Sequence, residues 1–205
     1  RRDDPRRHAQ GAQRRRRRFK LRTRSYVDTG GTFLELKTKS GRGSTVKDRL
    51  ACDEADRASI TAEGGSYVAR LLGDQGHRPD LVDELRPSIV SHYRRATLLL
   101  PGGSRATVDT ALRWACPRSG AALDLPDYAI IESKSAGAAT QLDRELWRMG
   151  HRPSGISKFG TGTAAMHPEL PDNKWARVLR GSFSAAIRSS GIGATVRRSP
   201  ATTQP

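Results

Sequence analysis

The sequence feature that most restricts the fold is a two-residue alternation in which basic side chains repeatedly occupy one of the two positions. In residues 19–28, FKLRTRSYVD, apolar and small side chains alternate with Lys20, Arg22, Arg24 and Tyr26. Because successive side chains of a strand point to opposite faces, this pattern predicts a β-strand with one basic face. Such a face is too highly charged to pack into an apolar core.

The same alternation returns further along the chain. Glu35 and Lys37 alternate with leucines, and Lys47 follows Val46. Glycine-containing turns are expected between the first strands, since glycine adopts the backbone angles of tight reversals. The predicted strands after the first are 32–39, 45–50, 92–100, 104–112 and 128–135, with turns at 28–31, 40–43 and 101–103.

Helices are fewer. Apolar residues at helical spacing favour a helix over 136–149, ended by Gly150, and a last one over 173–188. Shorter helices are predicted at 66–74 and 80–86, whereas the glycines of Gly160-Thr-Gly162 favour a turn. The predicted class is α+β, dominated by antiparallel sheet.

The charge is concentrated at the chain ends. The chain has 205 residues, with 37 basic and 21 acidic side chains, a net charge of +16. Residues 1–24 alone hold 12 basic and 2 acidic side chains. We therefore expect a basic, disordered-like segment at 1–18 that can touch nucleic acid non-specifically, one domain over 19–190 and a flexible tail at 191–205.

Several classes of protein are excluded. No apolar run approaches the roughly 18 residues of a membrane span. Cys52 and Cys116 are too few for a disulfide framework and lack zinc-ligand spacing, which favours a reducing, cytoplasmic setting. Neither GxxxxGK[ST] nor a GxGxxG between strand and helix is present, and the five histidines show no ligand spacing.

The repeated basic face has two interpretations. It is either a flat solvated surface or, if the sheet closes into a barrel, the lining of a lumen. A basic lumen would need a polyanion to offset its charge. A single Glu132 among bases would suit a divalent metal carried on that polyanion.

Seven short motifs follow one another along the chain: FKLRTR (19–24), FLELK (33–37), TVKDR (45–49), YRRA (93–96), RATVD (105–109), IESK (131–134) and SKFG (157–160). Their order resembles the VTC domain, the polyphosphate-polymerase branch of the triphosphate tunnel metalloenzymes in the CYTH-like superfamily. The resemblance covers about 19–180. It implies an antiparallel β tunnel barrel with flanking helices.

The resemblance also implies an activity, a substrate and a metal. Family members transfer the γ-phosphoryl group of ATP to a growing polyphosphate chain with Mn²⁺ or Mg²⁺. The resemblance implies that six residues are catalytic: Arg22, Arg24, Lys37, Lys47, Arg95 and Lys158. It implies that four more bind phosphate: Lys20, Arg105, Lys134 and Ser157. Glu132 is similar to the metal-binding carboxylate, and Glu35 and Asp109 could assist through metal-bound water or by orienting the bases.

The chemistry of phosphoryl transfer agrees with these residue types, because it needs mainly positioning and charge neutralisation, which arginine and lysine supply. The family has an earlier strand with tunnel bases before position 19, which 1–18 lacks, so we expect an N-terminally incomplete domain. The alternatives are a triphosphatase or nucleoside triphosphatase with the same tunnel, and a non-catalytic module that binds polyphosphate or RNA.

Overall fold

The computed structural model describes residues 18–39 and 45–192. The predicted N-terminal basic segment (apart from Arg18), the turn at 40–43 and most of the C-terminal tail lie outside the described residues. The chain divides into two units, Arg1–Pro87 and Ser88–Pro205, and each is described by itself.

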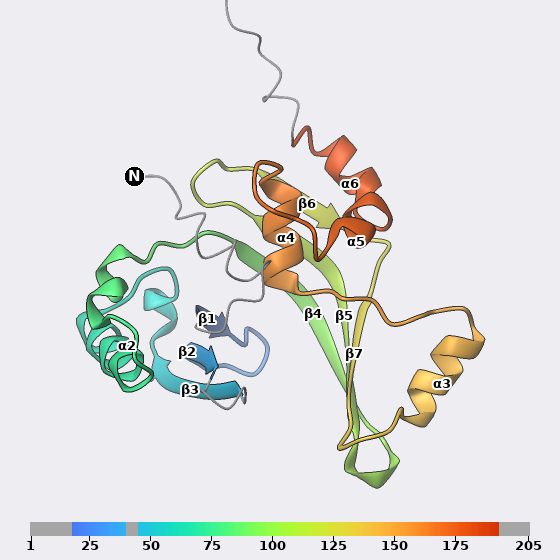
Figure 1. The fold of residues 1–205 in the computed structure, drawn as a ribbon, viewed down its shortest axis with the longest axis horizontal. Coiled ribbons are helices and arrows are strands. Elements are labelled where there is room, and N and C mark those ends of the chain that lie inside the picture. Colours follow the sequence, from blue (N-terminus) through green and yellow to red (C-terminus); the bar gives the residue numbers. More distant parts are fainter. Residues whose placement is uncertain (1–17, 40–44, 193–205) are drawn as a thin grey trace, which may run out of the picture. The chain divides into compact units, whose positions relative to one another are not determined.

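The first unit is a three-stranded antiparallel sheet covered on one face by a helix (Figure 1). Its strands are β1 (Phe19–Ser25), β2 (Thr32–Lys39) and β3 (Thr45–Cys52), in the order β1-β2-β3. They are followed by η1 (Glu54–Asp56), α2 (Ala62–Asp74) and η2 (Pro79–Glu84). The three predicted strands are thus confirmed. The helix predicted over 66–74 begins four residues earlier, and the one predicted over 80–86 is a 3₁₀ turn.

The alternation decides which side of this sheet is buried. Leu34 and Leu36 of β2 pack with Val68 and Leu72 of α2 to form the core. Thr61 caps the start of α2, because its hydroxyl accepts a hydrogen bond from the Gly64 N–H at 3.1 Å. The apolar side of the alternation therefore faces α2, and the basic side is the opposite face of the sheet.

The second unit is built around one long central strand. β5 (Arg105–Ala115) pairs with β4 (Val90–Leu99) along its length, and with β7 (Ile130–Lys134) and β6 (Ala122–Leu125) at its two ends. A 3₁₀ turn, η3 (Pro101–Gly103), joins β4 to β5. The helices are α3 (Gln141–Arg148), α4 (Lys158–Met166), α5 (Ala176–Arg180) and α6 (Ser184–Ser189). All the pairings are antiparallel, which confirms the α+β class and is consistent with a tunnel-like fold.

A bulge in β5 changes which side chains share a face. The register shifts between His92 and Arg94, where two residues of β5 oppose one of β4. At this point Ala111 adopts a φ of 49°, in the left-handed region. The extra residue reverses the alternation, so that Asp109 and Trp114 lie on the same, buried face of the strand.

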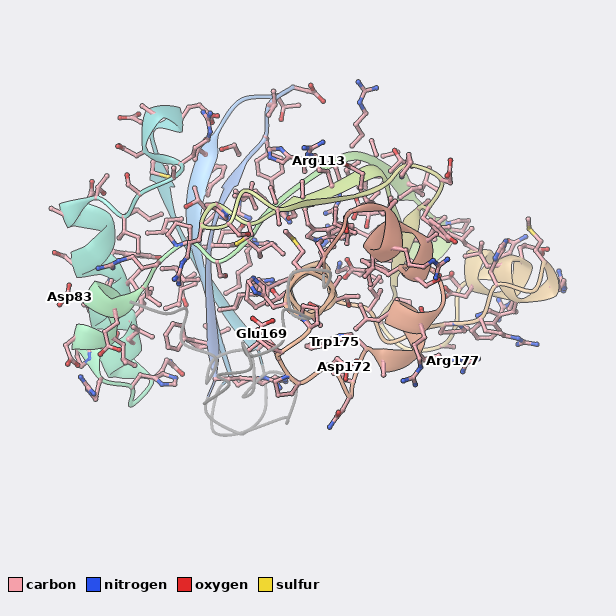
Figure 2. All side chains as sticks on the ribbon, turned by 90° about the horizontal axis from the view of Figure 1, so that it is seen from above. Asp83, Arg113, Glu169, Asp172, Trp175 and Arg177 are labelled. Carbon is pink, nitrogen blue, oxygen red and sulfur yellow. The ribbon has the colours of Figure 1, made fainter. Side chains whose placement is uncertain are left out.

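The segment predicted as a glycine turn is a helix, and this prediction was wrong. Gly160 and Gly162 lie inside α4, where they permit contact with two indole rings. A Cβ atom added at Gly160 would lie 2.2 Å from the ring of Trp175, which is labelled in Figure 2. A Cβ atom added at Gly162 would lie 2.4 Å from the ring of Trp114. The Trp114 indole N–H also donates to the Lys158 carbonyl at 2.9 Å, which fixes the start of the helix.

Two predicted helices also differ from the structure. The helix predicted over 136–149 begins at Gln141, because Thr140 and Asp143 form a capping box that defines its first turn. The helix predicted over 173–188 is interrupted at Gly181, which ends α5. The break allows Phe183 to be buried with its ring centroid 5.4 Å from that of Trp114. Across the described ranges, no helix is long and apolar enough to span a bilayer.

The contact between α4 and Trp114 predicts the effect of a single added methyl group. Gly162→Ala should lower the free energy of unfolding by about 1 to 3 kcal/mol, because the buried ring has no room for a Cβ. Urea unfolding followed by tryptophan fluorescence reports on this unit, since all three tryptophans lie in it. Gly155→Ala is the control, because nothing lies within 4 Å of a Cβ there. Equal effects of the two substitutions would contradict this packing.

The bulge predicts that one substitution stabilises the protein. Ala111→Gly should raise the free energy of unfolding by on the order of 1 kcal/mol, because glycine relieves the left-handed backbone at this position. Ala111→Val should lower it, since a β-branched side chain tolerates this conformation least. Thermal unfolding of both variants beside wild type checks the prediction, and a destabilising Ala111→Gly would refute the assigned backbone conformation.

Candidate functional site

The first unit carries a basic sheet face, formed by the side chains that alternate with its apolar core. Strand pairing arranges these residues in rows across β1, β2 and β3: Lys20, Lys37 and Lys47 form one row, and Arg22, Glu35 and Arg49 form the next. Arg24 lies in the following row beside Phe33. We call this set, from Lys20 to Arg49, the basic face of the first unit.

Glu35 lies at the centre of this face and is fully buried by its neighbours. Arg22 donates from Nε at 2.8 Å and from Nη2 at 2.5 Å to Glu35 Oε2. Lys47 Nζ lies 2.7 Å and Arg49 Nη2 3.3 Å from Glu35 Oε1. The carboxylate lies on the central strand and therefore holds cations from both outer strands in fixed positions.

The electrostatics of this cluster follow from its charge count. Burial alone would raise the pKa of Glu35, but the bonds from Lys47 and Arg22 outweigh it and lower the pKa to about 2. Lys37 is a cation among other cations. Burial, and then the charges of Arg22 and Lys47, lower its pKa. The basic face thus has more positive charge than its one central carboxylate offsets, which suits an anion with several charges.

The second unit repeats the arrangement around Asp109 on its central strand. Asp109 is fully buried and accepts a forked pair of hydrogen bonds from Arg95 of β4, with Nε at 2.6 Å and Nη2 at 2.7 Å. Lys158, the first residue of α4, forms an ion pair with the same carboxylate. Burial opposes ionisation of Asp109, but Arg95 and Lys158 keep its pKa below the usual range. In turn, Asp109 raises the pKa of Arg95.

Tyr93 packs against both cations of this second cluster. Its ring centroid lies 5.2 Å from the guanidinium carbon of Arg95 and 5.0 Å from Lys158 Nζ. Such cation–π contacts favour the charged side chains over the ring face. Arg95 and Lys158 are therefore oriented by a carboxylate and also by an aromatic ring.

Glu132 differs from the two buried carboxylates because its side chain is 50% exposed. It lies on β7, where Lys134 Nζ contacts its Oε1 at 2.5 Å. Lys134, and at longer range Lys158 and Arg95, lower the pKa of Glu132. Arg105 is the cross-strand partner of Lys134, so the bases of this unit continue along the same sheet face.

Ser157 precedes α4 and caps it. Its hydroxyl accepts a hydrogen bond from the Gly160 N–H at 3.2 Å. This cap fixes the first turn of the helix, from which Lys158 reaches Asp109.

The three predicted acidic residues do not fit a metal equally well. Across 18–39 and 45–192, no group of three or more His, Cys, Asp or Glu side chains could hold a metal ion. Glu35 and Asp109 have both oxygens engaged by cations, which fits the expectation that they orient the bases. Mg²⁺ and similar ions on phosphates need only one or two carboxylates, and the exposed Glu132 fits that requirement.

Two residues of these clusters were missing from the predicted site, Arg49 and Tyr93. Arg49 shares the strand parity of Lys47 within the TVKDR motif, so the alternation itself could have identified it. Tyr93 sits two residues before Arg95 and has the same parity. In a sequence, an aromatic residue among bases does not reveal that two cations will pack on it.

The depressed pKa of Glu35 makes the stability of the first unit depend on acid pH. The carboxylate ionises more readily in the folded protein than in the unfolded chain, so it stabilises the fold above about pH 5. This contribution is lost as the pH falls from about 5 to 2. We expect a loss on the order of 2 kcal/mol, allowing for solvent screening of the partly exposed cations.

Urea unfolding between pH 7 and pH 2, followed by circular dichroism, measures this loss. Glu35→Gln should be less stable at pH 7 and should lose less stability than wild type on acidification. Glu63→Gln, an exposed position of α2, serves as the control and should follow the wild-type profile. Parallel profiles for Glu35→Gln and wild type would mean that the cations do not hold this carboxylate.

Among the comparisons of this chain with known proteins, one family model matches it. No curated protein and no solved structure matches the chain. The family model described as VTC domain matches residues 3–167, a range that contains both clusters and all seven motifs. The chain therefore belongs to the VTC domain family.

Proposed function

We propose that this protein is a polyphosphate polymerase that transfers the γ-phosphoryl group of ATP to the end of a polyphosphate chain. Membership of the VTC domain family supports a polyphosphate-related function. The observation that carries the proposal is the pair of basic clusters, each oriented by one buried carboxylate, Glu35 or Asp109. Preoriented cations with excess positive charge are what a site for phosphate chains requires.

The reaction needs little covalent chemistry from the protein. A terminal oxygen of the polyphosphate chain forms a bond to the γ-phosphorus of ATP, the bond from that phosphorus to the β–γ bridging oxygen breaks, and ADP leaves with the electron pair. The attacking oxygen is already ionised, so no general base is needed. Catalysis then rests on positioning and on neutralising charge at the phosphoryl oxygens.

The described residues divide these tasks by their chemistry. Arginine forks match the paired oxygens of phosphate, which suits Arg22, Arg24 and Arg95, whereas Lys37, Lys47 and Lys158 supply point charges. In this proposal Glu35 and Asp109 are positioning residues that act through the bases. Four further residues would contact phosphate groups of ATP or of the chain: Lys20, Arg105, Lys134 and Ser157.

A divalent cation, Mn²⁺ or Mg²⁺, completes the proposal. Glu132 would hold it, because its carboxylate is exposed and the bond from Lys134 lowers its pKa from the usual range. When bound, such an ion neutralises charge on the phosphate oxygens. The ion pair between Lys134 and Glu132 would keep the carboxylate in place before ATP arrives.

The test is incubation of the protein with ATP and Mn²⁺, with products resolved on a gel stained for polyphosphate. We expect a ladder of chain lengths together with ADP. Glu132→Ala should reduce the rate of ladder formation at least about tenfold, through loss of charge stabilisation at the reacting phosphoryl group. Glu145→Ala is a matched control, because Glu145 is also an exposed carboxylate paired with a base, Arg148, at 2.5 Å.

Other products would replace the proposal with one of its alternatives. ADP and inorganic phosphate without a ladder would identify a triphosphatase, in which water takes the place of the chain. Binding of polyphosphate or RNA that is unchanged by Glu132→Ala, without turnover, would identify a polyanion-binding module. A ladder of undiminished rate in Glu132→Ala would refute the metal assignment and leave the polymerase activity standing.

A further inference from the structure

We propose that the end of the basic face nearest the β1–β2 turn is a subsite for the nucleobase of the nucleoside triphosphate, built by Tyr26, Phe33, Arg24 and Arg49. The inference rests on the proposed function, because it concerns the substrate of the same face. It assigns a task to Tyr26 and Phe33, which the phosphate chemistry leaves unused, and a second task to Arg49.

The rows of the basic face change character in one direction along the strands. The first row is Lys20, Lys37 and Lys47, and the second is Arg22, Glu35 and Arg49. The third row contains Arg24 with Phe33, and its β3 member is the small residue Ala51. Beyond Arg24 lies Tyr26, whose N–H donates to the Gly31 carbonyl at 3.0 Å and continues the hairpin pairing.

This order matches the layout of a nucleoside triphosphate, which carries its negative charge at one end and a flat apolar ring at the other. The row of Lys37 and the row of Phe33 are four residues apart on β2, or about 13 Å at the usual strand rise. An extended nucleoside triphosphate covers a distance of this size. Phosphates placed among the lysines would therefore bring the base to the aromatic row.

The aromatic end already has the contacts that stack planar groups. The rings of Tyr26 and Phe33 meet edge to face, with centroids 6.2 Å apart. Arg49 lies over the ring of Phe33 at 4.9 Å, and Arg24 lies 5.6 Å from the ring of Tyr26 and donates to its hydroxyl at 3.2 Å. Guanidinium planes and aromatic rings both stack on nucleobases.

The surface of this end is open to solvent. Tyr26 is 37% exposed, and the Arg49 side chain is 47% exposed. Phe33 is half-buried although it lies on the charged side of the sheet, whereas the leucines of β2 face the core. Phe33 therefore packs outside the core of this unit, with Tyr26 and Arg49 at the same end of the basic face.

The chemistry of the subsite sets its specificity. Stacking recognises the face of a base and is tolerant of which base it is. We therefore expect ATP and GTP to bind with similar affinity, with the triphosphate supplying most of the binding free energy. Arg49 would link the two parts, since it contacts both Glu35 and the Phe33 ring.

The experiment compares ligands with and without a base, in the absence of divalent metal so that nothing is turned over. Calorimetry gives the dissociation constants of ATP, GTP and inorganic tripolyphosphate for wild type, Phe33→Leu and Tyr26→Leu. Loss of one stacking contact should raise the dissociation constants of ATP and GTP about tenfold. Tripolyphosphate binding should stay within about twofold, because the row of Lys20, Lys37 and Lys47 is unchanged.

Tyr67→Leu is the matched control. Tyr67 lies on α2 and also packs under an arginine, Arg70, at 5.6 Å, but it belongs to the helix and not to the basic face. It should leave all three dissociation constants unchanged. Tyr26 is the more exposed of the two test positions, so its variant keeps the fold if Phe33→Leu does not.

The outcomes separate the subsite from the proposed function. If a variant weakens the binding of ATP and of tripolyphosphate equally, or if neither variant changes the dissociation constant of ATP, the nucleobase subsite is refuted while phosphate binding stands. If wild type binds neither ATP nor tripolyphosphate, the proposed function and the subsite fail together. A preference above tenfold for one base would overturn recognition by stacking alone.

Discussion

The arrangement of each unit depends on one interaction, the ion pairing of a buried carboxylate with the bases around it. Neighbouring side chains across a sheet lie about 5 Å apart, and like charges at that distance destabilise it. Glu35 on β2 lies between Arg22 and Arg49, and Asp109 on β5 lies opposite Arg95. A charge buried without a partner is costly, and bases crowded without an acid repel one another, so each stabilises the other.

The two units build this interaction from different parts. In the first unit the cations come from strands on either side, and simple alternation is enough to bring them together. In the second, one cation comes from β4 and the other from α4, 49 residues beyond Asp109 in the sequence. That contact depends on the packing of α4 on Trp114, and therefore on a helix with glycines where the indole rings lie.

This difference explains how much could be predicted from the sequence. The first unit is a local meander, so its strands, faces and central acid were all visible in the period-two pattern. The glycines of α4 were misinterpreted, because the reason for them lies in rings distant along the chain, Trp114 and Trp175. The break at Gly181 was missed for a similar reason, since it serves the burial of Phe183 against Trp114. Periodicity reports which side of an element is apolar, but not which distant ring it contacts.

The division between buried and exposed acids has a consequence for a substrate that must move. Under the proposed function, a chain lengthened by one unit has to shift by one phosphate before the next transfer. Bases with no internal partner would hold each phosphate with their full charge and retain the chain. Glu35 and Asp109 already pair with the bases nearest them, which under this proposal would weaken each phosphate contact while fixing its direction. Glu132 has no such task, because it is half exposed and pairs with a single lysine. In the proposed cycle Glu132 would therefore be the carboxylate that exchanges partners, whereas the buried acids would keep the geometry constant from one transfer to the next.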